Sequence, residues 1–159
     1  MRGGGTRKVT LPVQDLYAVT PAEYLEIADG VLHDLSWQMA RHMNVPVAGV
    51  YVANPGYTFG SAGIPRGAVL TELDGKPVAN LDEAMALIGA LGHRQRVTVR
   101  YFTMEETRSL QLTTIRIDRA AAQAFLLSPS AAVGGSPEVR TWRGTSMSAL
   151  RQSVATLKQ

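Results

Sequence analysis

The chain has 159 residues, 45% of them hydrophobic, which suffices for one ordinary domain with a real core and an extension. Its formal net charge of +3 comes from scattered Lys and Arg residues, unlike the clustered pattern of nucleic-acid-binding proteins. The absence of cysteine excludes disulfides and thiolate metal sites, and the three histidines lack metal-ligand spacing. We therefore expect neither a metal nor another cofactor.

Residues 1–12 are interpreted as a flexible arm, because their first eight residues are rich in glycine and basic residues. They carry no apolar signal core, and no apolar run in the chain approaches the roughly 18 residues of a membrane span. The location stays open: a complete chain would be cytoplasmic, and a piece of a longer secreted protein would be periplasmic.

The region before residue 50 predicts an extended segment and a helix. Residues 20–23 (TPAE) have a helix-start pattern, and residues 24–33 read as extended. Residues 34–43 are predicted to form a helix with Asp34 as its N-cap and Leu35, Met39 and Met43 on one stripe.

The central stretch, residues 49–91, contains strands, turns and one amphipathic helix. We predict strands at residues 50–53 and 68–73, a compact turn at 61–67, and a tight Asp-Gly turn at 74–75. Asn80 and Glu83 have the spacing of a capping box for the helix 81–91.

The rest of the chain divides into a pair of strands and a region of different composition. Residues 96–102 and 110–117 alternate between apolar and polar residues, which is typical of strands. After residue 118 Ala, Ser, Gly and Pro dominate, so residues 120–159 are interpreted as a linker with a short helix at 148–157.

The turns between these elements have characteristic sequences, namely Ala62-Gly63, Gly67-Ala68-Val69 and Asp74-Gly75-Lys76-Pro77-Val78. With the order of the elements, they resemble a PDZ domain of the HtrA/Deg serine protease family. A finer likeness, to the large fungal and plant branch with duplicated protease–PDZ halves, rests on residues 19–26, 33–36, 39–41, 49–52 and 97–102. The resemblance covers residues 13–119, which we take as the domain.

This resemblance implies an α+β fold: a PDZ-like, small, partly open β-barrel or sandwich of five to six strands flanked by two helices. It also implies a groove in which an extended peptide adds to a strand edge beside a helix. By position, the carboxylate-receiving loop, the accepting strand with its flank, and the helix wall comprise nine residues. They are Tyr24, Leu25, Glu26 and Ile27; Asp29 and Val31; and Leu81, Met85 and Ile88.

Two of these positions modify the expected ligand. Leu81 replaces the histidine of many PDZ domains, so the resemblance implies apolar ligand residues at the C-terminus and two positions before it. Glu26 replaces a usual glycine, and its carboxylate would repel a ligand carboxylate if it points inward. An internal or tethered segment is therefore the alternative occupant of the groove.

No catalytic residues are expected. Residues 144–148 (GTSMS) resemble the serine box of subtilisin-like proteases, but the Asp and His motifs that must accompany it are absent, as is a trypsin-like serine box.

The leading hypothesis is a regulatory or substrate-recognition module of a serine protease in protein quality control. Its partners would be peptides or unfolded segments, a protease domain or a second copy. The alternative is a structural assembly domain whose groove is filled internally.

Overall fold

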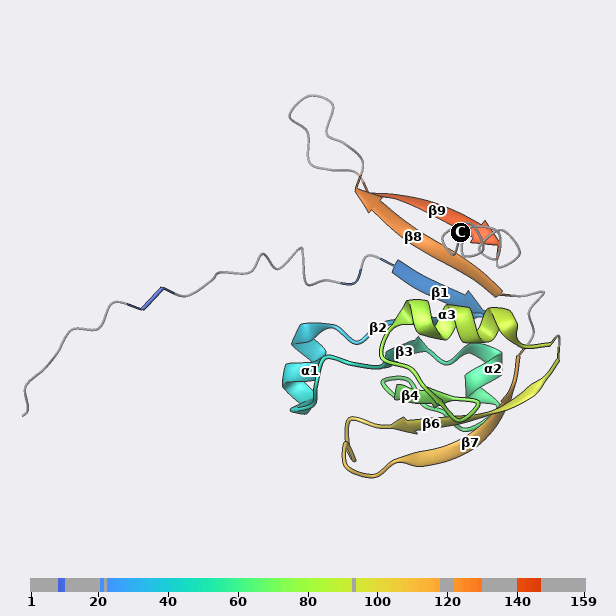
Figure 1. Ribbon diagram of the computed structural model, residues 1–159, viewed down its shortest axis with the longest axis horizontal. Helices are drawn as coiled ribbons and strands as arrows, with labels where there is room; N and C mark the ends of the chain where they lie inside the picture. Colours follow the sequence, from blue (N-terminus) through green and yellow to red (C-terminus); the bar gives the residue numbers. More distant parts are fainter. Residues whose placement is uncertain are drawn as a thin grey trace, which may run out of the picture.

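The structure is a computed structural model that describes residues 9–10, 21, 23–92, 94–117, 122–129 and 140–146 (Figure 1). The predicted α+β class is confirmed, with one nine-stranded antiparallel sheet and three helices in the described ranges. The elements in chain order are β1 (Glu23–Ile27), β2 (Gly30–Asp34), α1 (Trp37–Met43), β3 (Val50–Asn54), α2 (Gly56–Gly60), β4 (Val69–Leu73), β5 (Lys76–Pro77), α3 (Leu81–Ala90), β6 (Arg96–Phe102), β7 (Gln111–Arg116), β8 (Ala122–Pro129) and β9 (Arg140–Ser146).

The strands follow the order β7-β6-β4-β3-β2-β1-β8-β9, with β5 paired to β4. β7 and β8 are six places apart, which in a flat sheet would be about 29 Å. Only six residue steps join Arg116 to Ala122, and these span at most about 21 Å. The sheet therefore curls without closing, as a partly open barrel does, and the end of β7 and the start of β8 lie on the same side (Figure 1).

The main core lies inside this curl, under α3 and α2. Leu25 and Ile27 of β1, Leu32 of β2, Phe59 of α2 and Ile88 of α3 are all fully buried there. A second, smaller cluster lies under α1 and joins it to β4 and β6; its buried members are Leu35, Ala40, Met43, Val69 and Phe102. The strands and α3 are thus stabilised mainly by burial of apolar surface from one continuous interior.

Helix α1 begins later than the sequence predicts. Its N-cap is Ser36, whose Oγ accepts a hydrogen bond from the Met39 N–H at 3.2 Å. Asp34 is not the cap, because its backbone is still paired with Val50 as the last residue of β2. Leu35 consequently lies outside the helix, although it is buried against it.

The pattern-based strands agree closely with the structure. β6 has the predicted bounds, β7 is one residue shorter at each end, and the Asp74-Gly75 turn has φ values of 53° and 71°, as a two-residue hairpin turn requires. α2 was not predicted. It raises the number of described helices to three, where the resemblance implies two.

The C-terminal region differs most from expectation. Residues 122–129 and 140–146, expected to belong to a linker, are strands; together with the two-residue β5 they are the three strands by which the sheet exceeds six. The helix start expected at residues 20–23 is wrong at Glu23, which begins β1. The predicted helix at 148–157 and most of the arm at 1–12 lie outside the described residues. None of the described helices has the length and apolar character to cross a membrane.

Candidate functional site

The segment expected to be a carboxylate-receiving loop is the strand β1. It pairs with β2 through Leu25 opposite Leu32, Glu26 opposite Val31 and Ile27 opposite Gly30. Leu25 and Ile27 are fully buried, whereas Tyr24 and Glu26 are half-buried, so the side chains alternate as a strand with one core face requires. The prediction of a loop at residues 24–27 is therefore wrong, because the apolar side chains are held in the core by strand pairing.

The remaining two residues assigned to the accepting strand lie at a turn and inside the sheet. Asp29 is exposed in the β1–β2 turn, where Ala28 and Asp29 have left-handed φ values of 44° and 64°. Val31 belongs to β2, which pairs with β1 on one side and with β3 on the other. β2 therefore has no open edge for a ligand.

The β1–β2 turn is fixed by the segment that leads into α2. The Tyr57 N–H donates to the Ala28 carbonyl at 3.0 Å, and the Asn54 side-chain amide donates to the Asp29 carbonyl at 2.9 Å. The backbone of Gly56 lies so close to the β1–β2 turn that an added Cβ would be 2.1 Å from the Gly30 nitrogen. Only a glycine fits at this approach, so α2 positions the turn and through it the strand β1.

Helix α3 forms the second wall, but most of its apolar face is core. Leu81 and Ile88, two of the three predicted groove-lining residues, are buried, and Met85 is half-buried against the main core cluster. The structure thus brings Leu25, Ile27 and the α3 residues together, yet it leaves only Met85 of the three α3 side chains partly accessible.

The start of α3 is attached to β2 by hydrogen bonds. Asn80 is the N-cap as predicted, and its Oδ1 accepts from the Glu83 N–H at 2.9 Å, while Glu83 Oε2 accepts from the Ala79 N–H at 2.7 Å. Asp34 Oδ1 accepts from the Leu81 N–H at 2.6 Å. Three donors at this end are therefore satisfied, which fixes α3 against β2.

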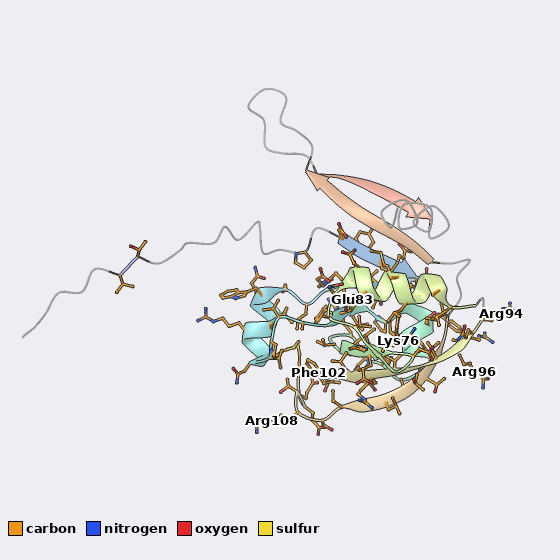
Figure 2. All side chains as sticks on the ribbon, viewed as in Figure 1. Lys76, Glu83, Arg94, Arg96, Phe102 and Arg108 are labelled. Atoms are coloured by element: carbon orange, nitrogen blue, oxygen red, sulfur yellow. The ribbon has the colours of Figure 1, made fainter. Side chains whose placement is uncertain are left out.

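In the segments that surround β1, namely the stretch from β1 to β2 and the helix α3, every Asp, Glu, Lys or Arg residue is an acidic one. The segment from β1 to β2 and the helix α3 with its cap contain six carboxylates and neither Lys nor Arg; the acidic residues are Glu23, Glu26, Asp29, Asp34, Asp82 and Glu83. Figure 2 shows Glu83 at the N-terminal end of α3, and Arg94 and Arg96 beyond its C-terminal end. Since the whole chain has a net charge of +3, this region is an acidic exception.

Two ionisable groups on β1 have pKa values that are raised by their surroundings. Partial burial raises the pKa of the Glu23 carboxyl, and the nearby charges of Asp82 and then Asp34 raise it further. Burial also raises the pKa of the Tyr24 hydroxyl, with a smaller contribution from Glu26. An added negative charge near the start of β1 would meet the same repulsion.

The outer edge of β1 is occupied by the chain itself. β8 pairs antiparallel with all five residues of β1, from Glu23 opposite Leu126 to Ile27 opposite Ala122. β9 then pairs with the far side of β8 (Figure 1). β1 therefore has a strand on both sides, and the sheet continues past the predicted groove.

Other features that could have a function lie away from the β1 edge. A cavity of about 330 Å³ between α2 and the β6–β7 hairpin is lined by hydroxyls and arginines, namely Thr58, Ser61, Thr114, Arg96 and Arg116 among its residues. Gly144 and Ser146, from the stretch that resembles a serine box, belong to β9. Among the described residues no group of three His, Asp or Glu side chains could hold a metal ion.

Sequence reasoning missed β8 and the role of Asp34. The run Ala124-Phe125-Leu126-Leu127 is apolar enough to signal a strand, but the Ala-, Ser- and Gly-rich surroundings masked it. Asp34 was read as a local cap, whereas it caps a helix that begins 47 residues later. No local pattern identifies such a long-range contact.

Comparison with known proteins agrees with this architecture. Residues 18–94 match the PDZ-like domain family. The chain is 35% identical over 127 residues, 79% of its length, to the pro-apoptotic serine protease NMA111 of Vanderwaltozyma polyspora. It is 37% identical over 125 residues (78%) to the protein of that name from Saccharomyces cerevisiae, and 32% identical over 117 residues (74%) to Protease Do-like 7 of Arabidopsis thaliana.

These relatives are much longer than this chain. The matched parts make up 13%, 12% and 11% of the three proteases, so the chain spans only about an eighth of their length.

Proposed function

This chain contains a PDZ domain of the HtrA/Deg family, of the kind found in fungal and plant serine proteases, and we propose that it is a regulatory module that binds peptides by strand addition. The observation that carries the proposal is the β1 edge. This edge accepts an extended segment along all five residues, next to the wall formed by α3. Main-chain hydrogen bonds of this kind supply affinity without requiring a particular ligand sequence.

Selectivity would come from the side chains beside that edge. Met85 and Leu87 are the half-buried apolar residues of α3, and methionine adapts to ligands of different shape. Leu81 and Ile88 support Met85 from the core. We propose that the site prefers ligands with apolar residues. This agrees with the presence of Leu81 at the position where many PDZ domains have a histidine that donates a hydrogen bond to the ligand.

The module would serve a protease domain that lies elsewhere, by holding unfolded segments or by reporting their presence. The three relatives are named as proteases, which supports this context. We propose that the chain itself has no proteolytic activity. A protease assay of the chain with an unfolded protein substrate is expected to give no turnover; turnover that Ser146→Ala abolishes would contradict this.

A second candidate, an assembly domain with a permanently filled groove, is favoured by one observation. β2 has no open edge and β1 is covered by β8, so no strand near α3 is unpaired among the described residues. If β8 never leaves, the domain would offer its outer surfaces to a partner or a second copy instead of binding peptides.

Titration of the full-length, ¹⁵N-labelled chain with an apolar octapeptide separates the two candidates. We expect saturable amide shifts on β1 and α3, at up to millimolar peptide because the resident β8 competes at about that effective concentration. Ile88→Arg is unsuitable as a test because Ile88 is fully buried. Met85→Glu should weaken binding at least about tenfold, since it introduces a charge at a desolvated contact.

Ala86→Glu is the matched control, because Ala86 is exposed on the same helix. It should leave the peptide affinity unchanged. Absence of any shift at millimolar peptide, together with a dimeric mass by light scattering, would favour the assembly domain.

A further inference from the structure

The occupant of the β1 edge indicates the kind of ligand that the site takes. β8 covers β1 from Ile27 to Glu23 and then continues through Leu127 to Pro129, which pair with β9. The chain also continues before Ala122, since Ile117 lies only five residues earlier. The edge is therefore filled by an internal segment, with chain on both sides and no terminal carboxylate.

The charges along β1 suit such an occupant. Because β8 runs antiparallel to β1, the C-terminal side of a strand in this orientation lies at Glu23, a carboxyl whose pKa is raised by partial burial and further by the charges of Asp82 and Asp34. A ligand that ended there would place its own carboxylate among these three acids. No Lys or Arg of β1, β2 or α3 is available to compensate it.

The α3 N-terminus does not offset this repulsion. Its amide donors could in principle attract an anion, but Asn80 Oδ1 and Asp34 Oδ1 already accept hydrogen bonds from two of them. At the other end of the edge the strand register pairs Glu26 with Gln123, a residue of an uncharged type. A continuous, uncharged main chain can lie along the whole β1 edge without repulsion from these acids. A terminal carboxylate placed at either end of the edge would be repelled by them.

From these observations, and on the basis of the proposed function, we infer that the β1 edge recognises internal extended segments rather than peptide C-termini. We further infer that β8 is its resident occupant, which an incoming segment must displace. The short connection from Ile117 gives β8 an effective concentration on the order of millimolar. The apparent affinity for an added segment is the intrinsic affinity multiplied by the fraction of molecules in which β8 has left the edge.

The experiment uses the full chain and an octapeptide with the sequence of residues 119–126, RAAAQAFL, which ends opposite Glu23, carries fluorescein on its N-terminus and is prepared with either an amidated or a free C-terminus. Ala124→Pro releases β8, because Ala124 is a central residue of a strand that is paired on both sides. Ala124→Val is the matched control, since valine favours strands. Gln123→Pro serves as a second variant if Ala124→Pro does not give a folded spectrum.

Fluorescence anisotropy should show that Ala124→Pro binds the amidated peptide at least about tenfold more tightly than the wild type and Ala124→Val do. The amidated and free-acid peptides should bind with affinities within about threefold, or the amide more tightly. Hydrogen exchange of the β1 amides should be faster in Ala124→Pro than in Ala124→Val, independently of any peptide.

Each contrary result has a distinct meaning. A free acid that binds at least about tenfold more tightly than the amide would overturn the inference and leave the proposed function standing. Equal affinity of the wild type and Ala124→Pro, or equal exchange of the β1 amides, would show that β8 is not the competitor. Faster exchange in Ala124→Pro without binding of either peptide would overturn the proposed function as well.

Discussion

The substitution Gly56→Ala tests how tightly α2 holds the β1–β2 turn. Gly56 has φ of 51°, and an alanine Cβ there would lie 2.1 Å from the Gly30 nitrogen and 2.4 Å from the Asp29 carbonyl carbon. Ordinary contacts of a Cβ begin at 3.4 Å, so the backbone of the turn must move by about 1 Å. No flexible side chain can absorb the overlap, because both atoms belong to the main chain.

The expected loss of stability has two parts. The left-handed conformation of a residue with a Cβ costs about 1–2 kcal/mol. The forced displacement of packed backbone adds about 1–3 kcal/mol, as overpacking of an interior does. Gly63→Ala isolates the first part, because Gly63 has φ of 77° and its added Cβ would meet nothing within 4 Å.

Urea unfolding followed by circular dichroism measures both variants with one linear extrapolation. Gly56→Ala should lose about 1–3 kcal/mol more than Gly63→Ala. Gly60→Ala is the baseline without either cost, since its backbone is helical and the nearest atom is 3.8 Å away. A difference of less than about 0.5 kcal/mol between Gly56→Ala and Gly63→Ala would refute the steric argument.

Two further substitutions test the contacts around the start of α3. Asp34→Ala removes the acceptor of the Leu81 N–H and should cost about 1 kcal/mol of unfolding free energy, whereas Asp34→Asn keeps an acceptor and should cost less than half of that; equal losses in urea unfolding would argue against this hydrogen bond. The raised pKa of Glu23 means that the folded chain binds this proton more tightly than the unfolded chain, so stability falls as pH rises through that pKa. Glu23→Gln should therefore stabilise the chain at neutral pH, with the gain vanishing below the ordinary value of 4.5; a gain that persists there would contradict the electrostatic cause.

Local patterns predicted the parts of the fold whose cause is local. The alternation of residues 96–102 places Val97 and Val99 in the core, and β6 has the predicted bounds. Asn80 accepts the hydrogen bond expected of a cap. In both cases the residues that determine the conformation lie within a few positions of one another.

Elements held by distant contacts could not be predicted in this way. The sequence of α2, GYTFG, has two glycines and no strong helix former, but Phe59 is fully buried and the Tyr57 N–H reaches Ala28. Tertiary burial stabilises this helix against its low intrinsic propensity. Residues 24–27 read as extended in the sequence, but only their pairing with β2 and β8 shows that they are a strand rather than a carboxylate-receiving loop.

The candidate site shows the same division. The resemblance identified the residues of α3 and β1 that meet around the core, but it could not reveal that Leu81 and Ile88 are buried and that β8 covers the edge. The acidity of the region, in contrast, is readable from the sequence once the elements are placed side by side. Glu26 was the one local signal that a terminal carboxylate fits poorly.

The pairing of β1 with β8 has a consequence for folding during synthesis. Leu25 lies opposite Ala124, so about 100 residues separate the two strands along the chain. At roughly 5–20 residues per second, synthesis delivers β8 some 5–20 s after β1. During that interval the newly made strand has a bare row of amide and carbonyl groups that a neighbouring nascent chain can meet. Arrival of the β8–β9 hairpin ends this period of vulnerability, so the last part of the described fold protects the first.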